Sequence, residues 1–295
     1  MEQYNIKQEK YSFYKEYINL MRPKQYIKNL FVLSAIVFSG NIIHINLFYK
    51  SMIAFICFCL ISSAVYILND IVDIEKDKCH PKKCKRPLAS GAIKKEKAVI
   101  LGVVLVIASI SLSLLVNLKL TAVIILYLLN NILYSFKLKN IVLLDVCSIA
   151  IGFILRILAG SVSVGVQLSN WIILCTFFLS LFLGLGKRKK EINTLKSSAG
   201  DHRKILKDYN EEIIDQMITV VQSCTIVCYA LYSTSSIDNP NMIFTTIFVI
   251  YGIFRYSYII NISDEGNPTD VVLNDTSLKI DVLLWVVTCV IILLF

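Results

Sequence analysis

Residues Ser51 to Asp77 read SMIAFICFCLISSAVYILNDIVDIEKD, an apolar run over 51–69 followed by an acidic end. A membrane-spanning helix needs about 20 predominantly apolar residues, and this run nearly supplies them. The run lacks the alternation of a half-buried strand, and a helix satisfies its own backbone hydrogen bonds in lipid. The stretch therefore predicts a transmembrane helix that carries Asn69, Asp70, Asp73 and Asp77 to the membrane boundary.

Eight further blocks have the same apolar character. They cover 29–45, 98–116, 120–136, 142–164, 170–186, 215–235, 242–262 and 279–295. The chain is 56% hydrophobic and 17% charged, whereas soluble domains are roughly 45–50% apolar and about 25% charged. We predict an all-α membrane protein, a bundle of nine transmembrane helices in one domain over 29–295. A cytoplasmic amphipathic segment over 1–28 precedes it.

The basic residues predict the orientation of this bundle. Lysine and arginine concentrate in the amino-terminal segment and in the connections 70–97, 137–140 and 187–214, whereas the opposite connections contain only Lys50 and Lys119. Cytoplasmic loops are enriched in basic residues. We therefore expect the amino terminus inside and the carboxyl terminus outside, in the inner (plasma) membrane. This distribution accounts for the net charge of +9 with the lipid bilayer as partner and no nucleic acid.

The acidic end of the 51–69 helix is the main candidate site. Asn69, Asp73 and Asp77 repeat at four-residue steps, and Asp70 joins them at a step of three. Side chains so spaced share one helical face, where like charges repel each other. A bound cation would offset the repulsion, and Mg²⁺ prefers hard oxygen ligands. The alternative is a solvated helix end, neutralised by nearby lysines.

Cations follow these carboxylates directly. Residues 80–91 read HPKKCKRPLASG, with Lys85 and Arg86 near the middle. A diphosphate site requires carboxylates that hold a metal, and beside them cations that bind the phosphate oxygens. In the same loop Cys79 and Cys84 flank His80. A structural zinc site needs about four ligands, so we expect reduced thiols there.

These residues resemble the UbiA superfamily of intramembrane prenyltransferases. Its first motif, N-D-x-x-D-x-x-x-D, is matched by Asn69, Asp70, Asp73 and Asp77, and its R-P-L-A-S-G stretch by residues 86–91. The resemblance implies a nine-helix fold and Mg²⁺ held by Asn69, Asp73 and Asp77. It also implies that Asp73 and Asp77 are catalytic.

Other stretches resemble one branch of this superfamily, the decaprenyl-phosphate phosphoribosyltransferases. The second aspartate motif of the standard prenyltransferases, D-x-x-x-D, is incomplete, because Asp145 is followed four residues later by Ile149. The stretches that match the branch are 22–29, 134–139, 152–160, 187–191, 254–256 and 266–268. The resemblance implies transfer of 5-phosphoribose from phosphoribosyl diphosphate (PRPP) to a polyprenyl phosphate, for cell-envelope polysaccharide synthesis.

The substrates are anionic, so we expect basic residues of matched stretches and span edges to bind them. Arg156 and Arg255 lie inside predicted spans, where a charge marks a functional site by default. An ion pair of Arg156 with Asp145 or Asp73 is an alternative, as is an Arg255 side chain that reaches toward the cytoplasm. The expected substrate-binding residues are Lys28, Asn69, Asp70, Lys85, Arg86, Tyr134, Lys139, Asp145, Arg156, Lys187, Arg188 and Arg255.

Two other functions stay open at this point. A standard prenyltransferase would share the fold and the first motif, and would join a polyprenyl diphosphate to an aromatic or other small acceptor. A transporter or scaffold would carry its charges near the midplane of the membrane, whereas most charges here lie at one face. The sequence does not determine whether the chain forms a homo-oligomer.

Overall fold

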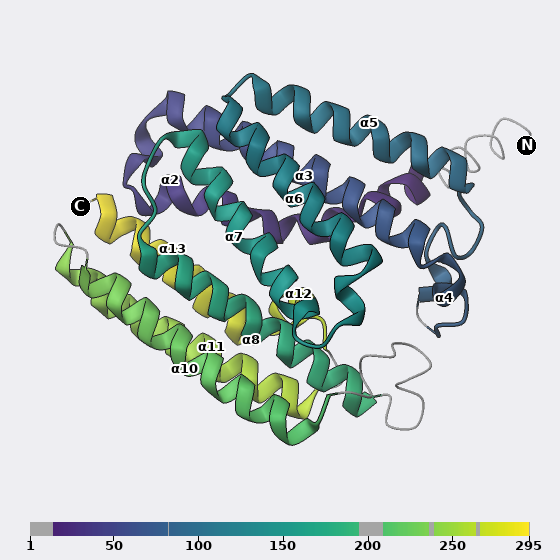
Figure 1. Cartoon of the computed structure of the whole chain (residues 1–295). Helices are drawn as coiled ribbons and strands as arrows, with labels where there is room; N and C mark the ends of the chain where they lie inside the picture. The colour runs from purple at the N-terminus through teal and green to yellow at the C-terminus, as the bar shows by residue number, and fades with distance from the viewer. Residues whose placement is uncertain (1–13, 82, 195–208, 236–238, 264–265, 295) are drawn as a thin grey trace, which may run out of the picture.

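The computed structural model describes residues 14–81, 83–194, 209–235, 239–263 and 266–294, and every regular element in these ranges is a helix (Figure 1). Eight helices are long and apolar enough to cross a membrane, and one of them consists of η6 followed directly by α11. They are α3 (Ile45–Val72), α5 (Lys95–Leu114), α6 (Leu118–Phe136), α7 (Leu144–Val164), α8 (Asn170–Thr194), α10 (Glu211–Ser235), η6 (Pro240–Thr245) with α11 (Thr246–Ile262), and α13 (Thr276–Leu294).

The helix expected over 29–45 has different bounds. A 3₁₀ helix, η1 (Pro23–Leu33), continues into the α-helix α2 (Ser34–Phe38), and Gly40 ends this segment with a φ of 67° before η2 (Asn41–Ile43). At about 2.0 Å per 3₁₀ residue and about 1.5 Å per α residue, the segment is about 30 Å long, the thickness of the hydrocarbon core. We therefore propose it as the ninth span. The boundary expected between residues 28 and 29 falls within η1.

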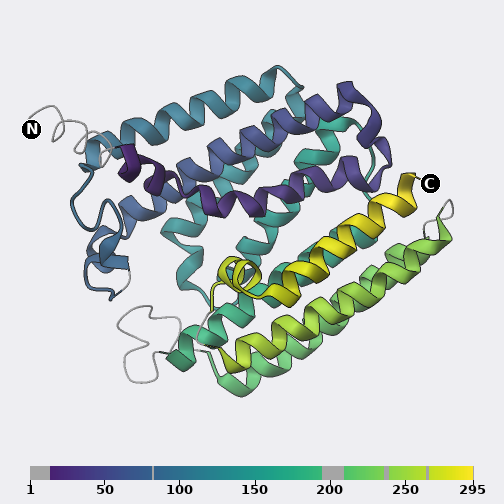
Figure 2. The same ribbon diagram turned by 180° about the vertical axis from the view of Figure 1, so that it is seen from behind.

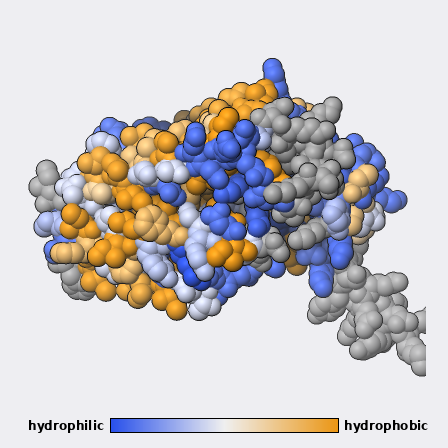
Figure 3. Space-filling view, turned by 90° about the horizontal axis from the view of Figure 1, so that it is seen from below, coloured by the Kyte–Doolittle hydropathy of each residue, from blue (hydrophilic) through white to orange (hydrophobic). Residues whose placement is uncertain are grey.

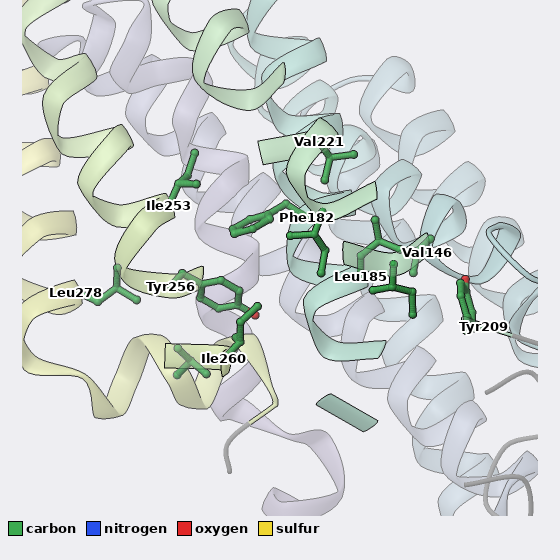
Figure 4. Packing of buried hydrophobic residues seen from close by; sticks show 12 residues of the cluster. Val146, Phe182, Leu185, Tyr209, Val221, Ile253, Tyr256, Ile260 and Leu278 are labelled. Carbon is green, nitrogen blue, oxygen red and sulfur yellow. The ribbon is translucent and has the colours of Figure 1, made fainter. Parts of the chain in front are cut away.

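The long helices form two groups. In the first group, α3 packs against η1, α5, α6 and α7, and in the second, α8 packs against α10 and α11; α7 and α8 join the groups. Phe58, Ile61 and Ile124 are buried in the first group. Phe182, Tyr256 and Ile260 are buried in the second, as Figure 4 shows. Each group thus has its own apolar core.

The outer surface is apolar as well. Ile100, Val104 and Ile107 of α5 are 63%, 55% and 59% exposed. Figure 3 shows apolar side chains over much of one flank, with hydrophilic ones gathered toward its middle and one end. Water would disfavour such a surface, whereas lipid does not. The chain is therefore a multi-pass membrane protein.

Four short elements lie at one end of the bundle. They connect the long helices on the side opposite to the end of α13 (Figures 1 and 2). This is the side on which the basic loops predict the cytoplasm, and it carries most of the candidate site. The short elements are α4 (Ile74–Lys78), η3 (Lys83–Lys85), η4 (Leu138–Asn140) and α12 (Pro268–Asn274).

Candidate active site

The acidic motif lies at a break between two helices. α3 ends at Val72, and Asp73 caps it with φ −102° and ψ 11° before α4 begins at Ile74. Backbone hydrogen bonds cross the break, from Asp73 N to Asn69 O (3.0 Å) and from Asp77 N to Asp73 O (2.8 Å). The turn is nearly helical, so the motif keeps much of the spacing that the sequence predicts.

Two carboxylates of the motif share one arginine. Nη1 of Arg86 lies 3.0 Å from Oδ1 of Asp70 and 2.5 Å from Oδ2 of Asp77. The two carboxylate oxygens therefore lie at most about 5.5 Å apart, the sum of these distances. Arg22 also donates to Asp70. Asp70 is 3% exposed and Asp77 4%, so both buried charges are compensated by guanidinium groups.

Asn69 and Asp73 face a different part of the bundle. Nζ of Lys139, from η4, lies 2.8 and 2.9 Å from the two carboxylate oxygens of Asp73. Oγ of Ser135, on α6, donates to Oδ1 of Asn69 at 2.5 Å. Lys139 is only 6% exposed. The motif is thus held on one side by arginines and on the other by α6 and η4.

The expected metal ligands are not gathered at one point. In the part of the chain that the structure describes, no three Asp, Glu, His or Cys side chains converge on a metal position, because a basic side chain holds each motif carboxylate. Carboxylate and amide oxygens are nevertheless the donors that Mg²⁺ prefers. Asn69, Asp73 and Asp77 therefore fit the ion chemically, provided that Arg86 and Lys139 turn from the carboxylates toward phosphate. Cys79 and Cys84 are free thiols.

Asp145 belongs to a second buried network. Nε of Arg188 lies 2.7 Å from its Oδ2, and the Tyr209 hydroxyl donates to its Oδ1 at 2.8 Å. Arg188 also contacts Glu191, and the Tyr209 oxygen accepts from Leu143 N at 2.9 Å. Burial, together with the Asp145 charge, raises the pKa of Tyr209. Figure 4 shows Tyr209 beside Val146 and Leu185.

Arg156 has no acidic partner among the described residues, so the alternative of an ion pair with Asp145 or Asp73 is wrong. Its Nε donates to Asn29 Oδ1 (2.9 Å), its Nη1 to Gly152 O (2.8 Å) and its Nη2 to the Tyr127 hydroxyl (2.9 Å). The side chain is 5% exposed. Asp145 is paired with Arg188 instead.

Lys28 adds positive charge near Arg156, and Lys187 adds charge near Lys28. Lys28 makes no hydrogen bond or ion pair with a described residue, and it is close enough to interact electrostatically with Arg156, Arg22 and the acidic Asp270. Lys187 interacts in turn with Lys28 and with Tyr134. Its side chain is 41% exposed, and its ammonium lies 3.9 Å from Glu191. Of the three cations Arg156, Lys28 and Lys187, only Lys187 forms an ion pair within the described residues, and its distance is 3.9 Å.

Two expected binding residues lie apart from this centre. Lys85 is exposed on η3 and forms no ion pair within the described ranges. Arg255 binds both oxygens of Asp275, at 3.2 and 2.6 Å. Asp275 also accepts from Leu278 N at 2.8 Å, at the start of α13. The hydrogen bonds from Arg255 lower the pKa of Asp275, so this pair joins α11 to α13.

Some residues of the site were not predicted. Arg22 adopts a left-handed backbone conformation, with φ 55° before Pro23, and its guanidinium reaches Asp70. Asn29 is fully buried, and a polar residue inside an apolar block is a signal that could have identified it. Tyr209 lies in a polar connection without any such signal. Tyr127 was counted only as part of an apolar span.

The chain is similar to known membrane enzymes over most of its length. The model of the UbiA prenyltransferase family matches residues 30–287. A relative from Mycolicibacterium smegmatis, named decaprenyl-phosphate phosphoribosyltransferase, is 33% identical over 92% of this chain and 90% of its own. A relative of the same name from Corynebacterium glutamicum is 34% identical over 91% and 84%.

The fold is similar to solved structures as well. A UbiA homologue from Archaeoglobus fulgidus, bound to GPP and Mg²⁺, has a TM-score of 0.73, with 95% of this chain and 99% of that chain covered. The sequences are 17% identical, so this likeness concerns the fold alone.

Proposed function

The chain belongs to the UbiA prenyltransferase family, and we propose that it transfers 5-phosphoribose from PRPP to a polyprenyl phosphate, with release of diphosphate. The two relatives described above carry the name of this activity and cover most of the chain. The observation that carries the proposal is that Arg156 and Lys28 form no ion pair within the described residues.

Cations without an ion pair fit the negative charge of the substrates. PRPP carries a phosphate at one end and a diphosphate at the other, and the acceptor adds a further phosphate. Lys28 and Arg156 have no ion pair within the described ranges, and Lys187 has only the 3.9 Å contact with Glu191. Buried charges are costly unless they are paired. Anionic substrates would provide the counter-ions that this part of the protein lacks.

In the proposed reaction an oxygen of the acceptor phosphate forms a bond to C1 of ribose. The bond from C1 to the diphosphate oxygen breaks, and its electron pair leaves with the diphosphate. Mg²⁺ held by Asn69, Asp73 and Asp77 would neutralise charge on this leaving group. Arg86 and Lys139, which contact the motif carboxylates, would stabilise the departing diphosphate. The acceptor is already anionic, so no general base is needed.

The location of the reaction follows from the topology. The acidic motif lies at the end of the bundle that carries the basic loops, so we place it at the cytoplasmic face of the plasma membrane. Water-soluble PRPP would reach the motif there from the cytoplasm. The polyprenyl phosphate would reach the site from the bilayer. Its phosphoribosyl product would serve cell-envelope polysaccharide synthesis.

A transfer assay tests the proposal. Purified protein in detergent would be supplied with radiolabelled PRPP and a polyprenyl phosphate, with and without Mg²⁺. We expect label in the lipid phase only when the metal is present, and no label with Asp73→Ala. Label transfer that persists in Asp73→Ala would contradict the role given to the motif.

A prenyltransferase is the second candidate, because the Archaeoglobus fulgidus homologue with the same fold is bound to GPP. Two observations count against it. Ile149 stands where the second aspartate motif needs a carboxylate. Arg156 places an uncompensated charge inside the bundle, where the apolar chain of an isoprenoid donor would not neutralise it.

A further inference from the structure

The guanidinium of Arg156 is held inside the bundle entirely by neutral groups. Its three nitrogens donate to Asn29, Gly152 and Tyr127, at 2.8 to 2.9 Å. Its central carbon lies 4.9 Å from the centroid of the Tyr127 ring and 5.1 Å from that of Phe153. The side chain is thus fixed in position, but no carboxylate among the described residues balances its charge.

A comparison with Arg188 shows that this arrangement is unusual within the same protein. Arg188 is equally buried, at 1% exposed, but it is paired with Asp145 and Glu191. A charge inside a membrane bundle is costly and is normally paired. Each terminal nitrogen of Arg156 donates one of its two N–H groups to protein, so a second N–H remains on each. Charge and spare donors together indicate an anionic ligand.

The neighbours of Arg156 orient it and add charge. Asn29 accepts from Arg156, and its own amide donates to Ser62 Oγ at 3.1 Å, so the acceptor oxygen is fixed by α3. Lys28 is adjacent in sequence to Asn29 and interacts electrostatically with Arg156. Cation–π contacts lower the cost of burying the guanidinium, but they do not cancel its charge. Two neighbouring cations at one place fit a phosphate dianion.

The position of Arg156 separates it from the acidic motif. Gly152, whose carbonyl Arg156 contacts, is eight residues into α7 from Leu144. At 1.5 Å per residue it lies about 12 Å from the cytoplasmic end of the helix. The motif, in contrast, lies at the cytoplasmic end of α3. Tyr66 lies between the two levels on α3, with its ring 5.1 Å from the guanidinium carbon of Arg22. Polar groups therefore continue from the motif toward Arg156.

We infer that Arg156 and Lys28 form a second anion subsite, which binds the 5-phosphate of PRPP while the motif faces the 1-diphosphate. The inference rests on the proposed function. PRPP has anionic groups at both ends, which matches cations at two depths. The phosphate of the acceptor lipid fits less well. The long polyprenyl chain would have to enter the bundle with it, among η1, α3, α6 and α7. The subsite would also select a sugar phosphate over an isoprenoid donor.

Steady-state kinetics with two competitive inhibitors, ribose 5-phosphate and inorganic diphosphate, tests the subsite. The full chain would be purified as wild type, Arg156→Gln, Arg156→Lys and Lys28→Gln. Lys119→Gln, which removes an exposed cation at the other end of the bundle, is the matched control. The KM values for PRPP and for a polyprenyl phosphate would be measured, with the inhibition constants of ribose 5-phosphate and inorganic diphosphate.

We expect Arg156→Gln to raise the KM for PRPP and the inhibition constant of ribose 5-phosphate by about 10- to 100-fold, the effect of a lost charge-assisted hydrogen bond. The inhibition constant of diphosphate and the KM for polyprenyl phosphate stay near wild type. Arg156→Lys recovers part of the loss, and Lys28→Gln shows a smaller loss of the same kind. An unchanged inhibition constant for ribose 5-phosphate, or a raised KM for the polyprenyl phosphate alone, overturns the inference.

The failure of the proposed function would be visible separately. A wild-type enzyme without any transfer from PRPP contradicts the proposed function. The subsite is then tested by binding alone, as the rise in melting temperature on addition of ribose 5-phosphate. A rise in wild type and Lys119→Gln that is lost in Lys28→Gln supports the subsite, and an equal rise in all three contradicts it. The Lys28→Gln variant serves here because Lys28 is only half-buried, so its replacement disturbs folding less than that of Arg156.

Discussion

Nη1 of Arg86 lies 2.5 Å from Oδ2 of Asp77, and the same nitrogen contacts Asp70 at 3.0 Å. Asp77 is one of the residues proposed to hold Mg²⁺, so the arginine contacts a carboxylate that the metal would use. Mg²⁺ and Arg86 would therefore compete for the same charge. Arg86 would be free to contact the diphosphate only when the metal has replaced it.

This competition predicts the behaviour of Arg86→Gln. Without Arg86 the carboxylates of Asp70 and Asp77 repel each other, which we expect to destabilise the metal-free protein by about 1–3 kcal/mol. Mg²⁺ relieves the repulsion, so it raises the melting temperature more in the variant than in wild type. Thermal unfolding with and without Mg²⁺ measures this, with Lys119→Gln as control. An equal rise in melting temperature in variant and wild type would show that Arg86 and the metal do not compete for Asp77.

Lys139 is expected to act on the reaction itself. Its ammonium contacts both oxygens of Asp73 and is nearly inaccessible to water, so its charge acts strongly on neighbouring anions. Lys139→Met should lower kcat by about 100-fold, the typical cost of one lost charge-stabilising donor. Lys139→Arg keeps the charge and should lose less. The kcat of each variant would be measured at saturating substrate. An equal decrease in kcat in Lys139→Met and Lys139→Arg would exclude a role for the charge.

The network around Asp145 is expected to stabilise the fold. Asp145→Asn leaves the buried Arg188 with only Glu191, and breaking a buried ion pair costs about 3–5 kcal/mol. Tyr209→Phe removes one hydrogen bond to Asp145 and one to Leu143 N, and should cost about 1–3 kcal/mol. Chemical or thermal unfolding in detergent would rank the two variants. A Tyr209→Phe protein less stable than Asp145→Asn would contradict this order.

Gly160 is expected to tolerate no side chain. A methyl group there would overlap the carbonyl oxygen of Val32, so α7 and η1 approach each other backbone to backbone. This approach also brings Asn29 to Arg156. Gly160→Ala should therefore lower the melting temperature and weaken PRPP binding together. Gly102→Ala is the matched control, because its methyl group would make only an ordinary contact of 3.6 Å with Ile67. Similar melting temperatures for the two variants would refute the close approach.

The helices could be predicted from sequence because each apolar block is long and is bounded by charge. The largest errors are at polar ends. α8 continues to Thr194 beyond the predicted end at residue 186, because lysine, arginine and glutamate are good helix formers. The segment that we propose as the first span begins earlier than predicted, at Pro23, and ends earlier, at Gly40. Apolar content alone does not indicate where a glycine turns the chain.

The site could be predicted only in part. The spacing of Asn69, Asp70, Asp73 and Asp77 identified the motif, because residues near in sequence share a helical face. The partners of these residues come from distant segments. Arg22 reaches Asp70 and Lys139 reaches Asp73, and no periodicity within one helix identifies which neighbour lies opposite. The same limit explains why an ion pair of Arg156 with Asp145 or Asp73 stayed open as an alternative.

The choice of donor tests the central claim most directly. One preparation of the wild-type protein with Mg²⁺ would be given PRPP with a polyprenyl phosphate, and in parallel a prenyl diphosphate with an aromatic acceptor, with labelled donors in both. We predict labelled lipid from PRPP and no product from the prenyl diphosphate. Product from the prenyl diphosphate alone would contradict the phosphoribosyl assignment and identify the chain as a prenyltransferase of the same fold.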